Sequence, residues 1–236
     1  MTVSYLDAGK ADCSILTDGA HSVVIDCAGE GNAPAVLAAL QTQHITQIDL
    51  LIVTHFDKDH IGGAADVLHH VSVQRVVKPD YEPENPESEA YTAYRAALDA
   101  ADITPERVSD SLDVTLGNMQ LRIFGAGGVS YEKNTDNNNS LVVTVTHLEN
   151  RFFFAGDIEK QRIADLLDSG VAGCDVLKVP HHGVYNKQLP ALFEALGMKN
   201  AVITCSEKNR QMKKRWTLWK RSAAASGRPQ TAKFAS

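Results

Sequence analysis

The segment at residues 49–54, Asp-Leu-Leu-Ile-Val-Thr, constrains the fold more than any other part of the chain. Its apolar side chains do not alternate with polar ones, so a strand here carries hydrophobic groups on both faces. Such a strand is stable only when other layers cover both faces of its sheet. We therefore predict a central strand at residues 49–54 in a sheet that is covered on both sides.

The rest of the chain divides into two similar series of predicted strands and helices. In the first series we predict antiparallel strands at residues 3–6, 13–17 and 23–27, a further strand at 73–77, and helices at 33–43 and 61–70, all around the central strand. In the second series we predict strands at residues 114–116, 119–124, 140–146, 151–155, 176–179 and 201–204, and helices at 159–169 and 187–196. Two strand-rich halves, each with helices, predict an α+β fold with four layers, an αββα sandwich.

The chain has 236 residues, enough for one large domain with its own core, and we assign that domain to residues 1–206. Within it, residues 79–110 are rich in proline and acids, and we predict an insertion near the site with a short helix at 89–101. The formal net charge of −6 conceals a split. The first 206 residues hold 14 basic and 28 acidic side chains, whereas residues 207–236 hold nine Lys or Arg and one Glu.

Membrane and secretory classes are not supported by the sequence. No apolar run approaches the ~20 residues that span a bilayer, and the first residues lack the basic and then apolar pattern of a secretory signal. We therefore expect a cytoplasmic protein with no membrane partner. The four cysteines stand singly among apolar residues, which predicts small buried side chains rather than a metal clamp.

The strongest chemical signal follows the central strand directly. His55, Asp57, Asp59 and His60 lie within six residues, where the strand ends and a helix is predicted to begin at about residue 61. Carboxylates packed so closely would repel one another unless cations lay between them. A solvated acidic turn is the alternative, but the following glycine pair and helix favour a compact ligand loop. We predict a metal site at this strand edge.

Three later segments also place ligand-type side chains at the ends of predicted strands. Asp157 follows one strand, and the adjacent His181 and His182 follow another. The Asn-rich residues 136–140 enter a further strand. Each segment alone is compatible with an ordinary turn. Because all of them lie at strand edges, we expect them to converge on the residue 55–60 site.

Together these motifs resemble the metallo-β-lactamase fold family. The residues from His55 to His60 look like its HxHxDH signature, with Asp57 where most members have the second His. That substitution, with segments 6–9, 138–142, 154–158 and 177–183, is similar to the C-terminal hydrolase domain of the ComEC competence proteins. The resemblance runs from about residue 3 to residue 204 in the family's order, and it implies a four-layer αββα metallo-β-lactamase sandwich.

The resemblance also implies a centre with two divalent metal ions. His55 and Asp57 would serve one ion, Asp59 and His60 the other, and Asp157 would bridge them. Two metal ions ~3.5–4 Å apart can hold a bridging hydroxide and stabilise both the attacking and the leaving oxygen.

Further site residues follow from the same resemblance. His182 is the favoured ligand of the histidine pair, and His181 is a ligand or a phosphate contact. Asn139, or Asn138, would replace a histidine ligand by an amide, which favours manganese or magnesium over zinc, although zinc stays open. Lys178 would stabilise phosphate charge if it faces the site, and a solvated lysine is the alternative. Asp59, His181 and Lys178 are our predicted catalytic residues.

The expected activity is metal-dependent hydrolysis of a phosphodiester, with DNA as the substrate that the resemblance implies and a nuclease as the corresponding enzyme. One alternative is a hydrolase of a small ester, thioester, lactone or phosphorylcholine ester. Another is a metal-binding regulatory module without turnover. We expect residues 79–110 and 125–137 to determine the choice of substrate.

Two departures from the family pattern stand out. Lys10 and Ala11 replace Gln and Gly of the family's opening motif, and the resemblance ends after Asn209. The atypical tail, residues 207–236, mixes both tryptophans with dense positive charge. It is interpreted as a basic nucleic-acid arm, as a frameshifted version of an amphipathic helix of the family, or as a disordered segment.

Overall fold

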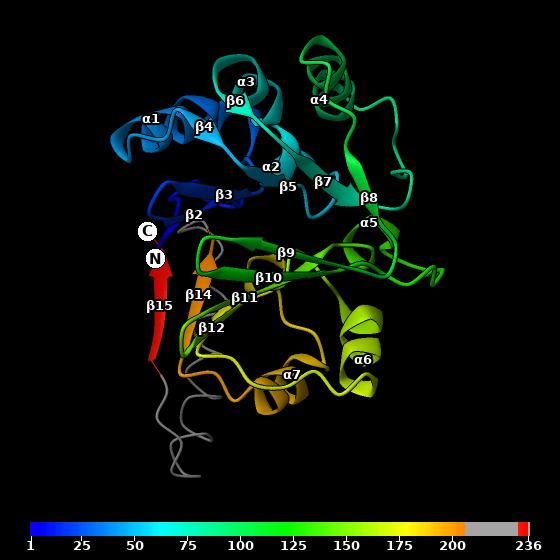
Figure 1. Cartoon of the computed structure of the whole chain (residues 1–236). Coiled ribbons are helices and arrows are strands. Elements are labelled where there is room, and N and C mark those ends of the chain that lie inside the picture. The colour runs from blue at the N-terminus through cyan, green and yellow to red at the C-terminus, as the bar shows by residue number, and fades with distance from the viewer. Residues whose placement is uncertain (206–230, 236) are drawn as a thin grey trace.

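The computed structural model describes residues 1–205 and 231–235, and its elements are stacked in four layers (Figure 1). The first sheet has the order β1, β2, β3, β5, β7, β8, with bounds Thr2–Tyr5, Ser14–Asp18, His21–Ile25, Leu50–Ile52, Val76–Pro79 and Glu106–Val108. The second has the order β15, β14, β13, β12, β11, β10, β9, with bounds Thr231–Ala235, Asn200–Thr204, Val176–Lys178, Asn150–Phe154, Val142–His147, Met119–Phe124 and Ser111–Leu116.

Helices cover the outer faces of both sheets (Figure 1). Those of the first half are α1, α2, α3 and α4, with bounds Ala33–Thr42, Lys58–Ile61, Ala64–His70 and Glu89–Ala100. In the second half, α6 and α7 cover the outer face, with bounds Lys160–Asp168 and Leu189–Leu196, and the short α5, Thr135–Asn138, lies at the edge near β8 (Figure 1). The 3₁₀ turns η1 and η2 have the bounds Glu30–Asn32 and His181–Gly183. The strands β4 and β6 form a small parallel pair with the bounds Gln47–Ile48 and Ser72–Val73. The predicted αββα sandwich is confirmed.

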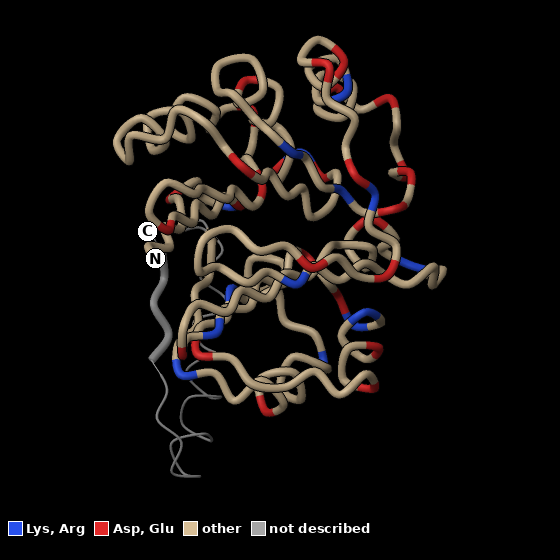
Figure 2. Tube along the Cα trace, viewed as in Figure 1, with Lys and Arg blue, Asp and Glu red and all other residues tan. Residues whose placement is uncertain are grey.

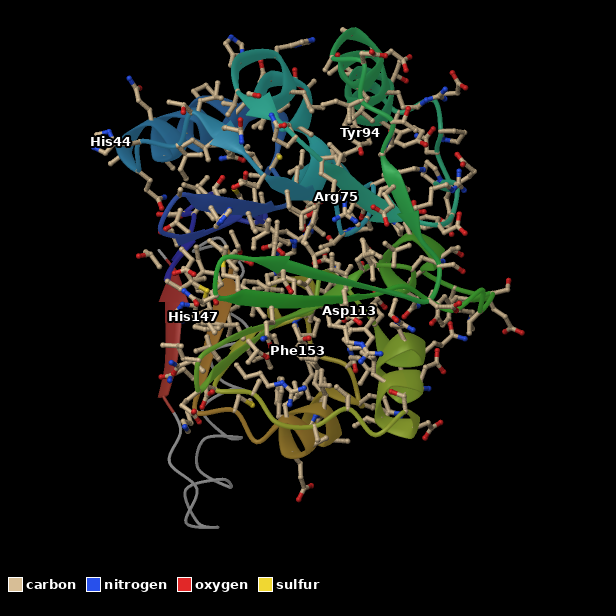
Figure 3. The ribbon with its side chains drawn as sticks, in the orientation of Figure 1. His44, Arg75, Tyr94, Asp113, His147 and Phe153 are labelled. Carbon is tan, nitrogen blue, oxygen red and sulfur yellow. The ribbon has the colours of Figure 1, made fainter. Side chains whose placement is uncertain are left out.

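The period of two along the strands divides the hydrophobic side chains among three cores. On β5, Leu50 and Ile52 pack between the two sheets, whereas Leu51 packs against the helices of the first half. On β12, Phe154 enters the layer between the sheets and Phe153 packs against the helices of the second half. Figure 3 shows Phe153 on the far side of the second sheet from the first half of the molecule. The prediction that both faces of the residue 49–54 strand are covered is therefore confirmed.

Two predicted elements differ in detail. The helix expected at 61–70 is two helices, because α2 already begins at Lys58 and the chain re-forms a helix at Ala64. Asp59 and His60 therefore lie in a helical turn rather than in a loop before it. Residues 79–110, expected as an insertion, form a crossover through α4 into β8, which pairs in parallel with β7. Tyr94 of α4 lies in the outer core of the first half (Figure 3).

The tail is described only at residues 231–235, whose backbone forms β15 in parallel with β14. The basic stretch at residues 207–230, with its interpretations as an arm, a frameshift or a disordered segment, lies outside the described residues. The cysteines have free thiols, and Cys13, Cys27 and Cys174 are buried as predicted, whereas Cys205 is half-buried. Among the described residues, no helix combines the length and the apolar character needed to cross a bilayer.

Candidate metal centre

Backbone hydrogen bonds lock three segments of the first half together at one end of its sheet. The N–H of Asp12, in the connection from β1 to β2, donates to the carbonyl of Asp59 at 3.0 Å. The Cys27 N–H donates to the carbonyl of His60 at 2.7 Å, and the Ala28 N–H donates to that of Asp12 at 2.8 Å. The turn of α2 therefore has a fixed position relative to Asp12 and to the end of β3.

Gly62 and Gly63 permit this close approach. A Cβ atom on Gly62 would lie 2.4 Å from the backbone nitrogen of Glu30, and one on Gly63 would lie 2.3 Å from the carbonyl oxygen of Cys27. Both distances are far below van der Waals contact, so only glycine fits at either position. The glycine pair recognised in the sequence therefore fixes the position of His60, the last-but-one residue of α2.

Four buried side chains converge at this point from both halves of the molecule. Asp12 follows β1, His60 lies in α2, Asp157 follows β12 and His182 lies in η2 after β13. One ligand-type atom from each lies within 4.8 Å of the others. Asp157 lies between the histidines, since its Oδ1 is 3.3 Å from Nε2 of His60 and its Oδ2 is 3.4 Å from Nε2 of His182.

The hydrogen bonds of the histidine rings fix which nitrogen faces this cluster. Nδ1 of His182 lies 3.0 Å from the Thr204 carbonyl oxygen, which can only accept, so Nδ1 carries the proton. Nδ1 of His60 lies 2.7 Å from Oδ2 of Asp26 and donates to it in the same way. In both rings Nε2 is therefore the free nitrogen that faces the cluster, an arrangement that metal-binding histidines commonly have.

His55 and Asp57 adjoin the four-residue cluster. The Thr54 hydroxyl donates to Oδ2 of Asp26 at 2.7 Å, so its oxygen can accept from Nδ1 of His55 at 3.2 Å. This leaves Nε2 of His55 facing Asp57, with 3.7 Å between that nitrogen and Oδ2. The rings of His55 and His60 are 4.1 Å apart between centroids. A second group of ligand-type atoms therefore lies directly beside the first.

Mutual electrostatics show that the cluster attracts positive charge. Burial opposes ionisation of His60, but the facing carboxylates of Asp157 and Asp26 outweigh it and raise its pKa well above the usual value. Burial also opposes ionisation of Asp157, yet His60 and His182 hold its pKa well below the usual range. The pKa of Asp59 is lowered in the same way, against its burial, by His182, His60 and Lys10.

A lysine lies inside the same cluster. The Lys178 side chain, at the end of β13, is buried, and its Nζ contacts Oδ2 of Asp12 and lies 3.9 Å from Oδ1 of Asp157. Burial lowers the pKa of Lys178, whereas the two facing carboxylates favour its protonated form. Lys178 therefore faces the site, and the alternative of a solvated strand-edge lysine is wrong.

The donor set fits a divalent cation. Carboxylate oxygens and imidazole nitrogens are the ligands that zinc, manganese and iron take in proteins. Within the described residues, the buried atoms without a hydrogen-bond partner include Oδ1 of Asp157 and Nε2 of both His60 and His182. Buried acceptors that face one another are stable only with a positive charge among them, from a proton, an ammonium group or a metal ion. These four residues would hold a metal ion.

Comparison with known proteins decides the family. The model of the metallo-β-lactamase superfamily matches residues 6–206. The chain belongs to the metallo-β-lactamase superfamily. Enzymes of this superfamily are metal-dependent hydrolases, and the four-residue cluster of this chain could hold a metal ion.

Individual proteins support this membership. ComE operon protein 3 of Bacillus subtilis is 30% identical over 174 residues, which cover 72% of this chain but only 22% of that protein. A hydroxyacylglutathione hydrolase of Photobacterium profundum is 40% identical over 63 residues, 27% of this chain and 23% of that enzyme. The metallo-β-lactamase fold protein YhfI of Bacillus subtilis superposes with a TM-score of 0.62 at 11% identity, covering 99% of this chain and 95% of that one. The ComEC-like resemblance of this superfamily member is therefore supported.

The remaining predicted site residues take different places around the superfamily centre. Oδ2 of Asp59 lies 3.4 Å from Nε2 of His182 and 3.3 Å from Nζ of Lys10, one of the residues that depart from the family motif. His181 lies at the half-buried rim, with its Nδ1 3.1 Å from Oε1 of Glu159. Burial lowers the pKa of His181.

Asn139 and Asn138 are both hydrogen-bonded away from the cluster. The amide nitrogen of Asn139 donates to the Thr135 carbonyl at 2.9 Å, and the Asn139 side chain lines a cavity instead. Oδ1 of Asn138 accepts the backbone N–H groups of Glu159 and Arg162, so it satisfies the first turn of α6. The ligand role predicted for Asn139 or Asn138 therefore stays a prediction.

Sequence reasoning missed Asp12, Asp26 and Thr204 as site residues. Asp26 accepts from the backbone N–H of Thr54 at 2.8 Å as well as from two side chains, and Thr204 donates its hydroxyl to Oδ1 of Asp12. Asp12 belongs to the family's opening motif but was given no ligand role, and Asp26 and Thr204 are single polar residues next to strands, without a local pattern. Asp26 also has φ +60°, a strained value for a residue other than glycine, but only coordinates show that signal.

A cavity of about 240 Å³ lies where the two segments expected to choose the substrate meet. Its lining includes Tyr81, Ser109, Tyr131 and Asn139. Tyr81 connects it to the metal centre, because its ring packs 5.1 Å from that of Phe56, the residue after His55. The segments 79–110 and 125–137 therefore border one cavity beside the centre.

Proposed function

We propose that this superfamily hydrolase cleaves phosphodiesters with the help of two divalent cations, and that its substrate is a nucleic acid, with DNA as the first candidate. The observation that carries the proposal is the buried ammonium of Lys178 among the ligand-type side chains. A phosphodiester carries a negative charge throughout its hydrolysis, so a cation beside the metal centre stabilises it. A neutral ester has less need of such a charge.

The residues divide into two neighbouring donor groups. Asp12, His60, Asp157 and His182 form the first, and His55 with Asp57 begins the second, while Asp59 lies at the open side of the first group. The many carboxylates favour manganese or magnesium, and zinc is the other candidate. Two bound cations would activate a water molecule and stabilise charge on the attacking and leaving oxygens.

The side chains of the chain itself would position the substrate around this centre. Lys178 would bind a phosphate oxygen from the buried side, and Lys10, which is partly exposed beside Asp59, would bind one from the open side. His181, at the rim, is placed to contact the phosphate or to exchange a proton with the leaving oxygen.

The cavity lined by Tyr81 and Tyr131 suits a neutral part of the substrate. Among the described residues that line it there is no Lys or Arg, and the acid among them, Asp80, is paired with Arg107, whose Nε lies 2.5 Å from Oδ1. A phosphate would lack a partner there. Aromatic rings and hydroxyl groups instead fit a flat group with hydrogen-bonding edges, such as a nucleobase.

Hydrolysis of a small ester is the competing function. The partial match to hydroxyacylglutathione hydrolases supports it. So does the acidic character of residues 1–206, because unspecific binding of duplex DNA normally uses a basic face. Figure 2 shows Asp and Glu on both halves of the molecule, with Lys and Arg scattered between them. A single-stranded or short substrate is therefore favoured over an unbroken duplex.

A substrate screen tests the proposal. The full chain is freed of metal and supplied in turn with manganese, magnesium or zinc, and then offered single-stranded DNA, duplex DNA, RNA, a small phosphodiester and a thioester. We expect hydrolysis of phosphodiesters that is lost on chelation and in Asp157→Asn. Asp99→Asn, on the exposed face of α4, is the matched control and should retain activity. Turnover of the thioester but of no phosphodiester would contradict the proposal.

A further inference from the structure

The environment of Lys178 is unusual for a lysine. Its side chain is only 4% exposed, and among the described residues its ammonium is paired with the carboxylates of Asp12 and Asp157. Lysine is almost never fully buried unless it is paired, because its ammonium loses strong hydration on burial. Both of its carboxylate neighbours belong to the four-residue ligand cluster.

Hydrogen bonds hold both the side chain and the backbone of Asp12 in one orientation. Its Oδ1 accepts the hydroxyl hydrogen of Thr204, and its backbone N–H and carbonyl are bonded to Asp59 and Ala28. The other oxygen, Oδ2, therefore has a fixed direction, toward both the Lys178 ammonium and Nε2 of His60, which is 3.9 Å away. Lys178, by contrast, has a four-carbon chain with freely rotatable bonds.

We propose that Lys178 and a divalent metal ion compete for Oδ2 of Asp12. In the metal-free centre the ammonium neutralises Asp12 and Asp157 and keeps these carboxylates in place. Two positive charges on one carboxylate oxygen in a buried site repel each other strongly. Because Asp12 is held by Thr204, it is the lysine that moves when a metal ion is bound.

The released ammonium gains a new role if the proposed function is correct. From β13 the side chain can reach only the surroundings of the same cluster, where an anionic substrate oxygen replaces the carboxylate as its partner. Lys178 would thus stabilise the apo centre and then the bound phosphodiester. This second half rests on the proposed function, whereas the competition for Asp12 rests on the cluster alone.

Metal affinity measured without any substrate tests the competition. Full-length wild type and Lys178→Met are stripped of metal, and their affinity for Mn²⁺ is measured against a chromophoric chelator. We expect Lys178→Met to bind Mn²⁺ on the order of tenfold more tightly, because the metal ion no longer has to displace the ammonium from Oδ2 of Asp12. We also expect a larger rise in melting temperature on metal addition, since the apo form loses the neutralising charge. Equal or weaker affinity in a folded variant would overturn the proposal.

Three further variants complete the test. Lys199→Met removes an exposed lysine that pairs with Asp175, and should leave the Mn²⁺ affinity unchanged. If Lys178→Met does not fold without metal, Asp12→Asn and the double variant Asp12→Asn/Lys178→Met replace it, since both partners of the Lys178–Asp12 contact are neutral in the double variant. Once Asp12 is neutral, removing the lysine should increase the affinity much less than tenfold. A full tenfold gain in that pair would refute Asp12 as the shared ligand.

Failure of the proposed function would give a different result. Tighter Mn²⁺ binding by Lys178→Met, together with no phosphodiester hydrolysis by wild type, would retain the competition and reject the substrate. If wild type does hydrolyse a phosphodiester, Lys178→Met should lower kcat/KM for it by at least tenfold. An unchanged kcat/KM would reject the second role of the lysine.

Discussion

Asp26 offers the most demanding test of how the centre is held, because it touches no proposed ligand atom that faces the cluster. Its carboxylate accepts three hydrogen bonds: from the Thr54 N–H at 2.8 Å, from the Thr54 hydroxyl at 2.7 Å and from Nδ1 of His60 at 2.7 Å. In Asp26→Asn, an NH₂ group replaces Oδ2, so the Thr54 hydroxyl and Nδ1 of His60, which both donate to Oδ2 in wild type, then face another donor. At ~1.5 kcal/mol for each lost charge-assisted bond, the metal-free protein should lose about 3 kcal/mol of stability.

The same substitution should weaken metal binding. Without the carboxylate, the His60 ring is free to rotate and its tautomer is no longer fixed, so we expect the affinity for Mn²⁺ to fall roughly 10- to 100-fold. Urea denaturation of the metal-free protein measures the first effect, and chelator competition measures the second.

Asp49→Asn is the matched control. Asp49 also accepts a backbone N–H, that of Ser22 at 2.8 Å, but its other partners are Gln47 and His21, neither of which is a proposed metal ligand. We expect a loss of about 1 kcal/mol and no change in metal affinity. If Asp26→Asn binds Mn²⁺ as tightly as wild type, or Asp49→Asn weakens it equally, the positioning role assigned to Asp26 is refuted.

Three further predictions concern other parts of the molecule. Gly62→Ala should cost at least ~2 kcal/mol, because its Cβ would lie 2.4 Å from the Lys58 carbonyl oxygen; a melting temperature within about 1 °C of wild type would contradict this. Tyr131→Ala should raise KM for an oligonucleotide several-fold and leave a minimal phosphodiester unaffected, so equal effects on both in steady-state kinetics would exclude the cavity as a subsite. Lys199 and the Arg151 N–H lower the pKa of Asp175, so the stability advantage of wild type over Asp175→Asn should be present above pH ~4 and disappear as the pH falls below it; pH-independent urea midpoints would oppose this.

The fold could be predicted from the sequence because its strongest signals are local. The apolar run at 49–54 predicted a strand that is buried on both faces, and the two series of short strands with helices predicted the four layers. The parallel strand β8 was missed, since Glu106 and Arg107 are exposed at the sheet edge and show no apolar period. Packing against β7, rather than the composition of 106–108, makes this segment a strand.

The candidate site was predictable where its residues are close in sequence. His55 and His60 stand five residues apart after a buried strand, so their spacing carries the information. Asp12 and Asp26 are single carboxylates near ordinary turns, and their role arises only when β1, β3 and α2 come together. The side-chain amide and the backbone N–H of Asn139 both donate to the Thr135 carbonyl in the turn of α5, which spacing along the chain does not reveal.

The hydrogen bond from Thr204 to Asp12 joins residues 192 positions apart. It links the first sheet to the second, as does the approach of Asp157 to His60. The centre therefore exists only while the two halves are docked, and its assembly must await the slow, non-local steps of folding. A bound metal ion would act as a clamp between the halves and slow their separation, so that the lifetime of the folded chain depends on metal supply in the cell.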